Sequence, residues 1–558
     1  MRPSPSLDDS PSGHSRKSPA RGVTSEPGYG AMGRSMKAVF WMTLAWAILL
    51  AVVCLLRNGG YQYDDTFITM RYARHLAQGQ GPRWNLSGAP VEGFSSPLHM
   101  LLLALLASAR VPLYTAARMI GFVSHAALVV FLWRFMSRRD GDMAAALVSA
   151  LLISSWPMLV WDVGGLETTL FAATLCMGTL VTLEYIETGR RTQIVAGGAL
   201  LGLAVFVRPD GALVAMAALL SCLALAQGRS LRGRVADVAL AACACALVVL
   251  PWQIFRMTYY HAALPNTYYA KVYGIPLDWR VTEGLAYCRL YLRNPPNLAL
   301  MAVVVGIAVL VKRRGTRFDV GLWACMAAYG LFVITSGGDH MMAFRFMVPL
   351  VPLLAVELVR GIAGFGGLKT VGWAVAVSLL LALASARQLR AGTLNPYYRD
   401  WAGLMGEEIG HYITAHWAPG SVVGVNVAGT TAYFADNMNF IDMLGLNDRE
   451  IARRNPVPVN LPTVSEIGHM KGNGAIILAR RPEYIIPFGG NGPLLKINDL
   501  GHFLSEYEMA RLPVFWKEYE PCELTLTISK DAVKELPSSF EFFYYQRRDV
   551  QTPCTTPE

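Results

Sequence analysis

Long apolar stretches separated by short basic clusters dominate the first two-thirds of the chain. A helix needs about 20 consecutive apolar residues to cross the hydrocarbon core of a bilayer. On this criterion the sequence predicts eleven membrane-spanning helices, of which the first is Ala38 to Leu56. The other ten are predicted at 115–136, 143–161, 165–187, 192–207, 210–227, 235–256, 297–311, 318–335, 343–360 and 369–386. The apolar stretch Leu98 to Ala109 is too short to cross and is predicted to lie on the membrane surface as a helix.

Basic residues gather between alternate apolar stretches, and such clusters favour the cytoplasmic side of a membrane. Eleven spans place all of them on one side, so the sequence predicts a cytoplasmic N-terminus and a C-terminus outside the cytoplasm. The acidic loop at Asp64, the loop 257–296 and the chain after Arg387 fall on the other side. The clusters are Arg34 and Lys37, Arg138 and Arg139, Arg190 and Arg191, Arg229 to Arg234, Lys312 to Arg317, and Lys369.

The two ends of the chain have the composition of non-membrane segments. Residues 1–37 begin with a stretch rich in Ser, Pro, Gly and Arg and are predicted to form a disordered cytoplasmic tail. Residues 387–558 carry the Pro, Asn and Asp expected of a soluble domain, which we expect to be a mixed α/β module in the periplasm. Strands are predicted at Ser421 to Val427, Gly474 to Leu478 and Glu483 to Ile486. Cys522 and Cys554 could form a disulfide there.

Composition agrees with a polytopic membrane protein. Hydrophobic residues make up 53% of the 558 residues and charged residues 16%, and the mean hydropathy is +0.35. The formal net charge of +10 could indicate nucleic-acid binding. However, the Lys and Arg residues lie beside apolar stretches, where they orient helices in a bilayer. We therefore expect no nucleic acid among the partners.

The first outer loop, predicted at 58–114, carries the adjacent carboxylates Asp64 and Asp65 directly after the first span. A carboxylate held at the membrane surface can take a proton from an acceptor hydroxyl. A helix over 66–77 would bring together three cationic residues and offer a surface for phosphate: Arg71, Arg74 and His75. The alternative is a solvated loop whose charges only flank a helix start.

Three further clusters of ionisable residues fall on the same side of the membrane. They contain Glu167, then Arg208-Pro209-Asp210 and Lys271, and then Asp339-His340 with Arg345. Ionisable residues at membrane depth are functional candidates, although Arg208 could simply pair with Asp210. Because all clusters share one face, the sequence predicts a single active site there.

The sequence contains no Gly-rich phosphate loop, no metal-spaced Cys and His pattern and no nucleophile elbow. Nucleotide sugars and ATP are absent outside the cytoplasm, so an activated group would have to arrive already attached to a membrane lipid. No cofactor is predicted with certainty and no metal site is assigned. The carboxylates could hold a divalent cation, yet they can also act without one.

Nine short motifs in a fixed order resemble the membrane glycosyltransferases of the GT-C superfamily, and the first three resemble the opening loop of bacterial arabinofuranosyltransferases of the AftB type. The resemblance covers most of the chain. The motifs are Asp64-Asp65-Thr66-Phe67-Ile68, Arg71-Tyr72-Ala73, Val91-Glu92-Gly93-Phe94-Ser95-Ser96-Pro97, Gly165-Leu166-Glu167-Thr168, Arg208-Pro209-Asp210-Gly211, Pro265-Asn266-Thr267-Tyr268-Tyr269-Ala270-Lys271, Gly337-Gly338-Asp339, Phe344-Arg345-Phe346 and Ile441-Asp442-Met443-Leu444-Gly445-Leu446.

The resemblance implies a GT-C-type helical membrane domain at 38–386 in the bacterial inner (plasma) membrane, followed by the periplasmic α/β domain. It implies inverting transfer of a sugar, with D-arabinofuranose favoured, from a polyprenyl-phosphate donor to a glycan, glycolipid or secreted protein. Asp64 or Asp65 would be the general base. The donor phosphate would contact Arg208, Lys271 and Arg345. Sugar or acceptor hydroxyls would contact Glu92, Glu167, Asp339 and His340.

Other functions remain open from the sequence. The same scaffold serves mannose and other polyprenyl-phosphate sugars. The acceptor is open because the outer domain is modest in size and the N-terminal tail resembles no member of the family. A lipid or sugar transporter would need acids buried in mid-span and an internal repeat, whereas a non-catalytic assembly factor would be expected to lack the carboxylates.

Overall fold

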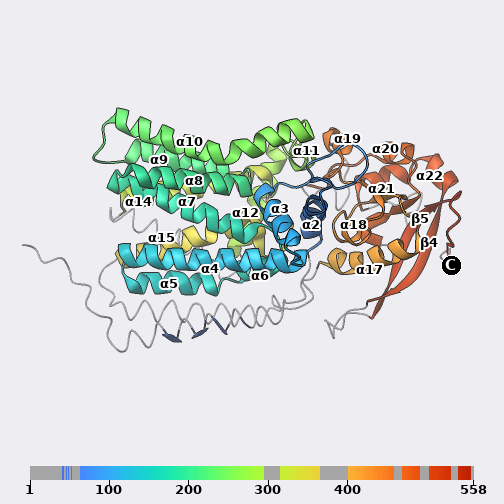
Figure 1. The fold of residues 1–558 in the computed structure, drawn as a ribbon, viewed down its shortest axis with the longest axis horizontal. Helices are drawn as coiled ribbons and strands as arrows, with labels where there is room; N and C mark the ends of the chain where they lie inside the picture. The colour runs from blue at the N-terminus through green and yellow to red at the C-terminus, as the bar shows by residue number, and fades with distance from the viewer. Residues whose placement is uncertain are drawn as a thin grey trace, which may run out of the picture.

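The computed structural model consists of a bundle of long helices with a mixed α/β domain at one end (Figure 1). It describes residues 63–293, 315–364, 400–457, 468–490, 502–528 and 538–554, together with a few residues between 41 and 52. The predicted tail 1–37 and the predicted spans 297–311 and 369–386 lie outside the described residues, as does most of the span Ala38 to Leu56.

Five helices of the described residues are long and apolar enough to cross a membrane. They are Leu113–Arg139, Thr168–Thr188, Leu231–Tyr260, Arg317–Ser336 and Met342–Gly361. They contain α4 (Leu113–Arg139), α7 (Thr168–Thr188), α10 (Leu231–Phe255) with the π-helix η1 (Arg256–Tyr260), α14 (Arg317–Ser336), and the 3-10 helix η2 (Met342–Leu350) with α15 (Val351–Gly364). Five of the eleven predicted spans thus correspond to helices that are long and apolar enough to cross a membrane.

The predicted span 143–161 is not one straight helix. It consists of α5 (Asp142–Ile153) and α6 (Trp156–Gly164), which meet at 53° and make a sixth crossing if they are counted together. The bend has a local cause, because Pro157 in the first turn of α6 has no N–H to continue the ladder from α5.

Two further predicted spans, 192–207 and 210–227, form the helices α8 (Arg191–Val207) and α9 (Gly211–Leu225). They have 17 and 15 residues, which is short of the roughly 20 residues of a full crossing. The count of eleven spans therefore exceeds what the described residues support.

Both loops predicted on the side of Asp64 contain helices. The first loop (residues 63–112) holds α2 (Asp64–Ala77) and α3 (Pro97–Ser108). Helix α3 covers the predicted surface helix, but one face of it packs on α2, α4 and α8. The loop 257–296 holds α11 (Asn266–Lys271) and α12 (Leu277–Arg293), and α12 packs along α14.

The C-terminal domain is built on a five-stranded sheet in the order β2-β1-β3-β5-β4. Strands β1, β2 and β3 are parallel, β5 pairs antiparallel with β3, and β4 pairs antiparallel with β5 at the edge of the sheet. The strands are β1 (Val422–Val425), β2 (Asn439–Asp442), β3 (Tyr484–Ile486), β4 (Tyr519–Thr527) and β5 (Ser539–Arg547). The helices are α17 (Trp401–His416), α18 (Thr430–Phe434), α19 (Arg449–Arg453), α20 (Gly474–Ala479), α21 (Leu504–Met509) and α22 (Pro513–Glu518), with the 3-10 turn η4 (Pro487–Gly490).

The domain confirms the prediction of a mixed α/β fold, with one error in its elements. The strands predicted at 421–427 and 483–486 are present as β1 and β3, whereas Gly474 to Leu478 is the helix α20. Asn473 caps this helix because its side chain accepts a hydrogen bond from the N–H of Ile476. Cys522 and Cys554 form the disulfide that their shared location allowed.

One hydrophobic core joins the first loop to the C-terminal domain. Phe67 and Tyr72 of α2 belong to the same buried cluster as Phe440 of β2 and Tyr484 of β3. Backbones also approach closely, since a Cβ on Gly429 would lie 1.9 Å from the carbonyl oxygen of Asp64. Only glycine fits at such an approach, so the two parts are docked along a specific contact.

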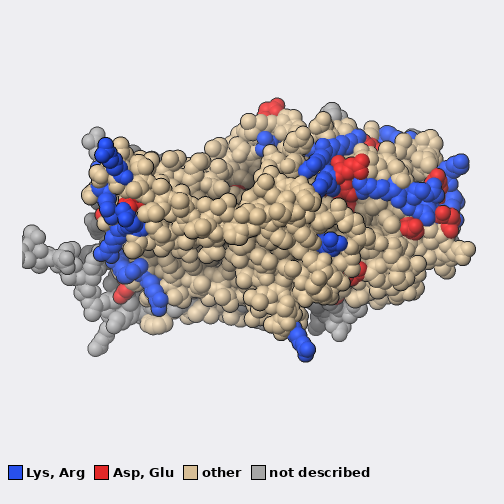
Figure 2. Space-filling view, turned by 45° about the horizontal axis from the view of Figure 1, so that its top comes forward, with Lys and Arg blue, Asp and Glu red and all other residues tan. Residues whose placement is uncertain are grey.

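Charge is distributed unevenly over the molecule. Figure 2 shows a helical region almost without charge, between a group of basic side chains at the end far from the C-terminal domain and mixed charges over that domain. Three basic clusters of the described residues lie at helix ends on this far side: 138–139 at the end of α4, 190–191 at the start of α8, and 229–234 at the start of α10.

Candidate functional site

A cavity of about 500 Å³ lies where the first loop, the ends of the bundle helices and the C-terminal domain meet. Residues from all four clusters singled out in the sequence line it together. They are Asp65, Glu167, Arg208, Lys271, Asp339, His340 and Arg345. Asp64 and Glu92 are not among the lining residues. The expectation that distant clusters share one site thus agrees with the geometry for most of them.

Asp64 and Asp65 occupy the first turn of α2 but have different surroundings. Asp65 lines the cavity. The buried Asp64 carboxylate accepts hydrogen bonds from the backbone N–H groups of Gly429 (3.0 Å) and Thr430 (2.6 Å) at the start of α18. Burial, with Asp400 close by, raises the pKa of Asp64 to about 8. Asp64 therefore holds α2 against the C-terminal domain, whereas Asp65 faces the cavity.

Arg208 lies between α8 and α9 at the centre of a buried ion-pair network. Its guanidinium donates to Glu167 at 2.8 Å and to Asp210 at 3.0 Å. Pro209 stops α8 from continuing, because it lacks an N–H, and so sets the turn on which Arg208 sits. The pair with Asp210 that the sequence left open as an alternative is present, and Arg208 lines the cavity at the same time.

Arg345 is held by two N–H groups on one carboxylate. Its Nε and Nη2 donate to the two oxygens of Asp339 at 2.7 and 3.2 Å. Burial alone would raise the pKa of Asp339, but the charges of Arg345, His340 and Lys271 and the hydrogen bond from Arg345 together outweigh burial and lower it. Phe346 lies 5.1 Å from the guanidinium carbons of both Arg345 and Arg208, which gives the two cations a common aromatic support.

Lys271 and His340 complete the polar lining. Lys271 ends α11, and among the described residues it has no ion-pair partner within 4.0 Å. The Nδ1 atom of His340 lies 4.0 Å from a carboxylate oxygen of Asp339, and its ring lies beside that of His469 of the C-terminal domain, with ring centroids 4.9 Å apart. Lys271 is the cation of the cavity that is least committed to other protein groups.

Glu92 lies away from the cavity. Its carboxylate pairs with Arg256 at 2.5 Å and accepts a hydrogen bond from the indole of Trp252 at 3.0 Å. Both partners belong to the end of α10 and to η1, so Glu92 ties the first loop to this helix. Its placement does not favour the predicted contact with a sugar or acceptor hydroxyl.

The three cationic residues of α2 pair with an acid of the C-terminal domain. Arg71, Arg74 and His75 all approach the carboxylate of Asp436, at 3.3, 3.6 and 2.9 Å. Burial raises the pKa of Asp436, but the hydrogen bond from His75 and the charges of Arg71, His75 and Arg74 outweigh burial and lower this pKa to about 2. The predicted phosphate surface on this helix is therefore a docking contact with the C-terminal domain.

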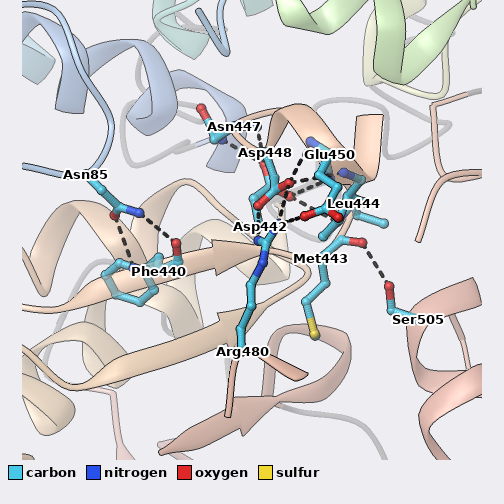
Figure 3. A network of polar contacts seen from close by, with 12 residues as sticks. Asn85, Phe440, Asp442, Met443, Leu444, Asn447, Asp448, Glu450, Arg480 and Ser505 are labelled. Carbon is cyan, nitrogen blue, oxygen red and sulfur yellow. Dashed lines mark hydrogen bonds and ion pairs between the residues drawn. The ribbon is translucent and has the colours of Figure 1, made fainter. Parts of the chain in front are cut away.

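The C-terminal domain contributes Leu446 to the cavity. Leu446 belongs to a loop after β2 whose shape is set by Asp442, as Figure 3 shows. The Asp442 carboxylate accepts hydrogen bonds from the N–H groups of Leu444, Gly445 and Asn447 at 3.0, 3.1 and 2.7 Å. These bonds give Asp442 a folding role. An apolar Leu carries no chemical signal, so its place in the cavity could not be read from the sequence.

The described residues that line the cavity contain no group of three metal ligands. Within the described parts of the chain, no three His, Cys, Asp or Glu side chains are grouped as metal ligands. Three acids of the cavity, Glu167, Asp210 and Asp339, are instead paired with guanidinium groups.

Comparisons with family models and curated proteins give partial matches. Residues 95–255 match the model described as dolichyl-phosphate-mannose-protein mannosyltransferase. Residues 394–533 match a model described as a domain of unknown function. None of the curated proteins compared with the chain matches it.

Similar solved structures extend over most of the chain. ArnT from Cupriavidus metallidurans bound to undecaprenyl phosphate has a TM-score of 0.50 at 16% identity, covering 72% of this chain and 86% of that one. The oligosaccharyltransferase AglB from Archaeoglobus fulgidus, in complex with an inhibitory peptide and a dolichol-phosphate, has a TM-score of 0.45 at 11% identity, covering 73% and 65%. The likeness to ArnT is one of fold, and it extends over 72% of this chain.

Proposed function

We propose that this protein is a membrane glycosyltransferase that transfers a sugar from a polyprenyl-phosphate donor to a cell-envelope glycan, glycolipid or secreted protein. The observation that carries the proposal is the shared cavity, in which the carboxylate of Asp65 lies together with the cations Lys271 and Arg345. A base for an alcohol and cations for a phosphate are the two groups that this transfer requires. The mannosyltransferase model that matches 95–255 supports this class of reaction.

The reaction would be a single displacement. The acceptor hydroxyl oxygen attacks the anomeric carbon while Asp65 takes its proton, and the bond from that carbon to the phosphate oxygen breaks. The polyprenyl phosphate leaves with the electron pair, and Lys271 and Arg345 stabilise its charge. One displacement inverts the configuration at the sugar carbon. Glu167, Asp339 and His340 line the same cavity and would contact sugar hydroxyls.

Arg208 is the third proposed contact of the donor phosphate. It lines the cavity, but Nε and Nη1 already donate to Asp210 and Glu167. Its net field at the phosphate is therefore weaker than that of Lys271. Its main effect would be to fix the two carboxylates and support the aromatic ring that it shares with Arg345.

Asp65 is a better base than Asp64 because of access. Asp65 lines the cavity and can reach a substrate hydroxyl. Asp64 is 6% exposed and its two oxygens already accept backbone N–H groups. Of the two carboxylates that the sequence left open, we therefore assign general-base catalysis to Asp65 and the docking of α2 to Asp64.

We propose D-arabinofuranose as the transferred sugar because of the amino-acid sequences of the motifs from Asp64 to Leu446 and the order in which they occur. Mannose is the second candidate, because the family model that matches 95–255 describes mannosyltransferases. We further propose that the cavity and C-terminal domain face the periplasm from a bacterial inner membrane. Basic clusters at the opposite end of the bundle support this orientation.

The test is transfer of labelled sugar by the purified protein from synthetic polyprenyl-phosphoryl arabinofuranose, and in parallel from the mannose donor, to cell-envelope acceptors. We expect Asp65→Asn to lower kcat by roughly 10² to 10⁴, the usual contribution of a general base. The donor KM should change little, since the substitution removes proton transfer and keeps the shape.

Asp278→Asn is the matched control, because Asp278 is also an acid in the first turn of a helix but is exposed and lies outside the cavity. It should leave kcat unchanged. Full activity of Asp65→Asn would reject the assignment of the base. Failure of the wild-type protein to transfer from either donor or to bind polyprenyl phosphate would reject the proposed function.

A further inference from the structure

The short helix α11 brings Lys271 to the cavity, but it cannot fix its own position. It has six residues, and isolated helices of this length are not stable in water. It lies between the bundle and the C-terminal domain, where it packs against α19. The contacts at its two ends therefore decide where Lys271 points.

Asn266 fastens the start of α11 to the C-terminal domain. Its buried side-chain amide donates to the carbonyl oxygens of Gly445 and Leu446 at 2.8 and 3.0 Å, and to that of Asp448 at 3.2 Å. Its backbone N–H donates to the carbonyl of Glu92 at 2.9 Å. The loop that accepts these bonds is the one shaped by the Asp442 carboxylate (Figure 3).

Lys471 fastens the end of α11. It is 1% exposed, and its ammonium donates to the carbonyl oxygen of Tyr273 at 2.9 Å and to that of Arg454. Burial lowers the pKa of Lys471 to about 8, as expected for a cation whose partners are uncharged carbonyl groups. Ile275, two residues after Tyr273, packs with Met470 in a small core.

The C-terminal domain also contacts α11 between these two points. The guanidinium of Arg453 in α19 lies 4.7 Å above the ring of Tyr269. Gly468 lies beside the stem of Lys271, so that a Cβ at this glycine would be 3.6 Å from the lysine Cγ. Contacts at both ends and along the middle leave α11 little freedom relative to the domain.

We propose that the C-terminal domain is a positioning element of the site, which fixes α11 through Asn266 and Lys471 so that Lys271 reaches the cavity. Neither residue lines the cavity, so both act through Lys271. The inference rests on the proposed function in one respect, namely that Lys271 binds the donor phosphate. It gives residues 394–533, which match a domain of unknown function, a role within the site of the membrane domain.

The experiment measures the affinity of the full-length protein for polyprenyl monophosphate in nanodiscs. Lys271→Ala should weaken binding about 10-fold, the value of one charge-assisted hydrogen bond. Asn266→Ala and Lys471→Met should each weaken it roughly 3- to 10-fold. Because they act through the same lysine, each double variant with Lys271→Ala should bind as Lys271→Ala does. Independent, additive losses would overturn the proposal.

Two control variants separate positioning from general loss of stability. Asn85→Ala removes a side chain that also joins the first loop to the domain, through both backbone groups of Phe440 (Figure 3), but does not touch α11. Lys517→Met removes an exposed charge elsewhere on the domain. Both should keep the wild-type affinity. A loss in Asn85→Ala equal to that in Asn266→Ala would overturn the proposal, because it would show a general effect of domain docking.

Hydrogen exchange tests the positioning without any ligand, and so independently of the proposed function. Asn266→Ala and Lys471→Met should speed amide exchange across 266–273, whereas Lys271→Ala should not. If the wild-type protein fails to bind polyprenyl monophosphate, the proposed function fails and this measurement alone decides the inference. Unchanged exchange over 266–273 in both variants would overturn it.

Discussion

At the scale of single residues, the cations of the cavity differ in how many carboxylates they pair with. Arg208 is shared by two carboxylates, Glu167 and Asp210, at 2.8 and 3.0 Å. Lys271 has no ion-pair partner within 4.0 Å among the described residues. A buried charge that loses its only partner is costly, whereas loss of an unpaired cation leaves no opposite charge behind. Substitution of Arg208 should therefore lower the stability of the fold, whereas substitution of Lys271 should not.

Arg208→Ala should destabilise the fold by about 3–5 kcal/mol, because it leaves buried carboxylates without a partner. Lys271→Ala should keep the wild-type melting temperature and lose affinity for polyprenyl phosphate. Thermal unfolding in detergent, measured beside binding, checks both. An unchanged melting temperature for Arg208→Ala would contradict the view that this ion-pair network supports the fold.

The sequence identifies which charged residues lie near this site, but it does not predict the direction in which each side chain points. Glu92 and Glu167 lie in equally specific motifs, yet one pairs with Arg256 outside the cavity and the other lines it. Local spacing gives the side of the membrane on which a residue lies. It does not give the partner, because the partner comes from a helix more than 150 positions away along the chain.

At the scale of elements, α2 is held to the C-terminal domain by a carboxylate with a raised pKa. Burial and Asp400 raise the pKa of Asp64 from 3.8 to about 8, and that of Asp400 is raised to about 6. The folded protein thus keeps protons that the unfolded chain releases near pH 4. Between these values the unfolded state binds fewer protons, so the free energy of unfolding falls as the pH rises.

Asp64→Asn should flatten this decline, because an amide does not titrate. We expect the melting temperature of the wild-type protein to fall between about pH 5 and about pH 8, and that of the variant to fall less. The residual slope belongs to Asp400 and other groups. Asp278→Asn should keep the wild-type slope. An identical slope in Asp64→Asn would show that Asp64 is ionised over the whole range.

Elements with a strong periodic signal are predictable, and short apolar runs are not. Helix α4 closely matches the predicted span 115–136, because 27 residues of mostly apolar sequence leave few alternatives. The run Gly474 to Leu478 reads equally well as a strand or a helix. It forms the helix α20 because Asn473 caps its first turn and because it packs against α21. Tertiary contacts of this kind are invisible in a local pattern.

At the scale of the whole molecule, the C-terminal domain and the first loop share one core and several buried polar bonds. Phe67 contacts Tyr433 with ring centroids 5.1 Å apart, and the hydroxyl of Tyr72 lies 3.0 Å from the side-chain oxygen of Asn447. Loosening the domain should therefore loosen the cavity. The disulfide between Cys522 and Cys554 gives a way to change the stability of the domain far from the cavity.

Removal of this disulfide should lower the stability of the domain by about 3–4 kcal/mol, the value for a loop of this length. The double variant Cys522→Ala/Cys554→Ala should melt earlier than the wild-type protein, and its binding of polyprenyl phosphate should be lost over the same lowered temperature range. A mild reductant should reproduce the effect in the wild-type protein, because the other six described cysteines are free thiols. If binding instead persists after the domain has melted, the bundle forms the donor site alone and the two parts are energetically independent. If both are lost together, the C-terminal domain is required for the cavity to hold its ligand.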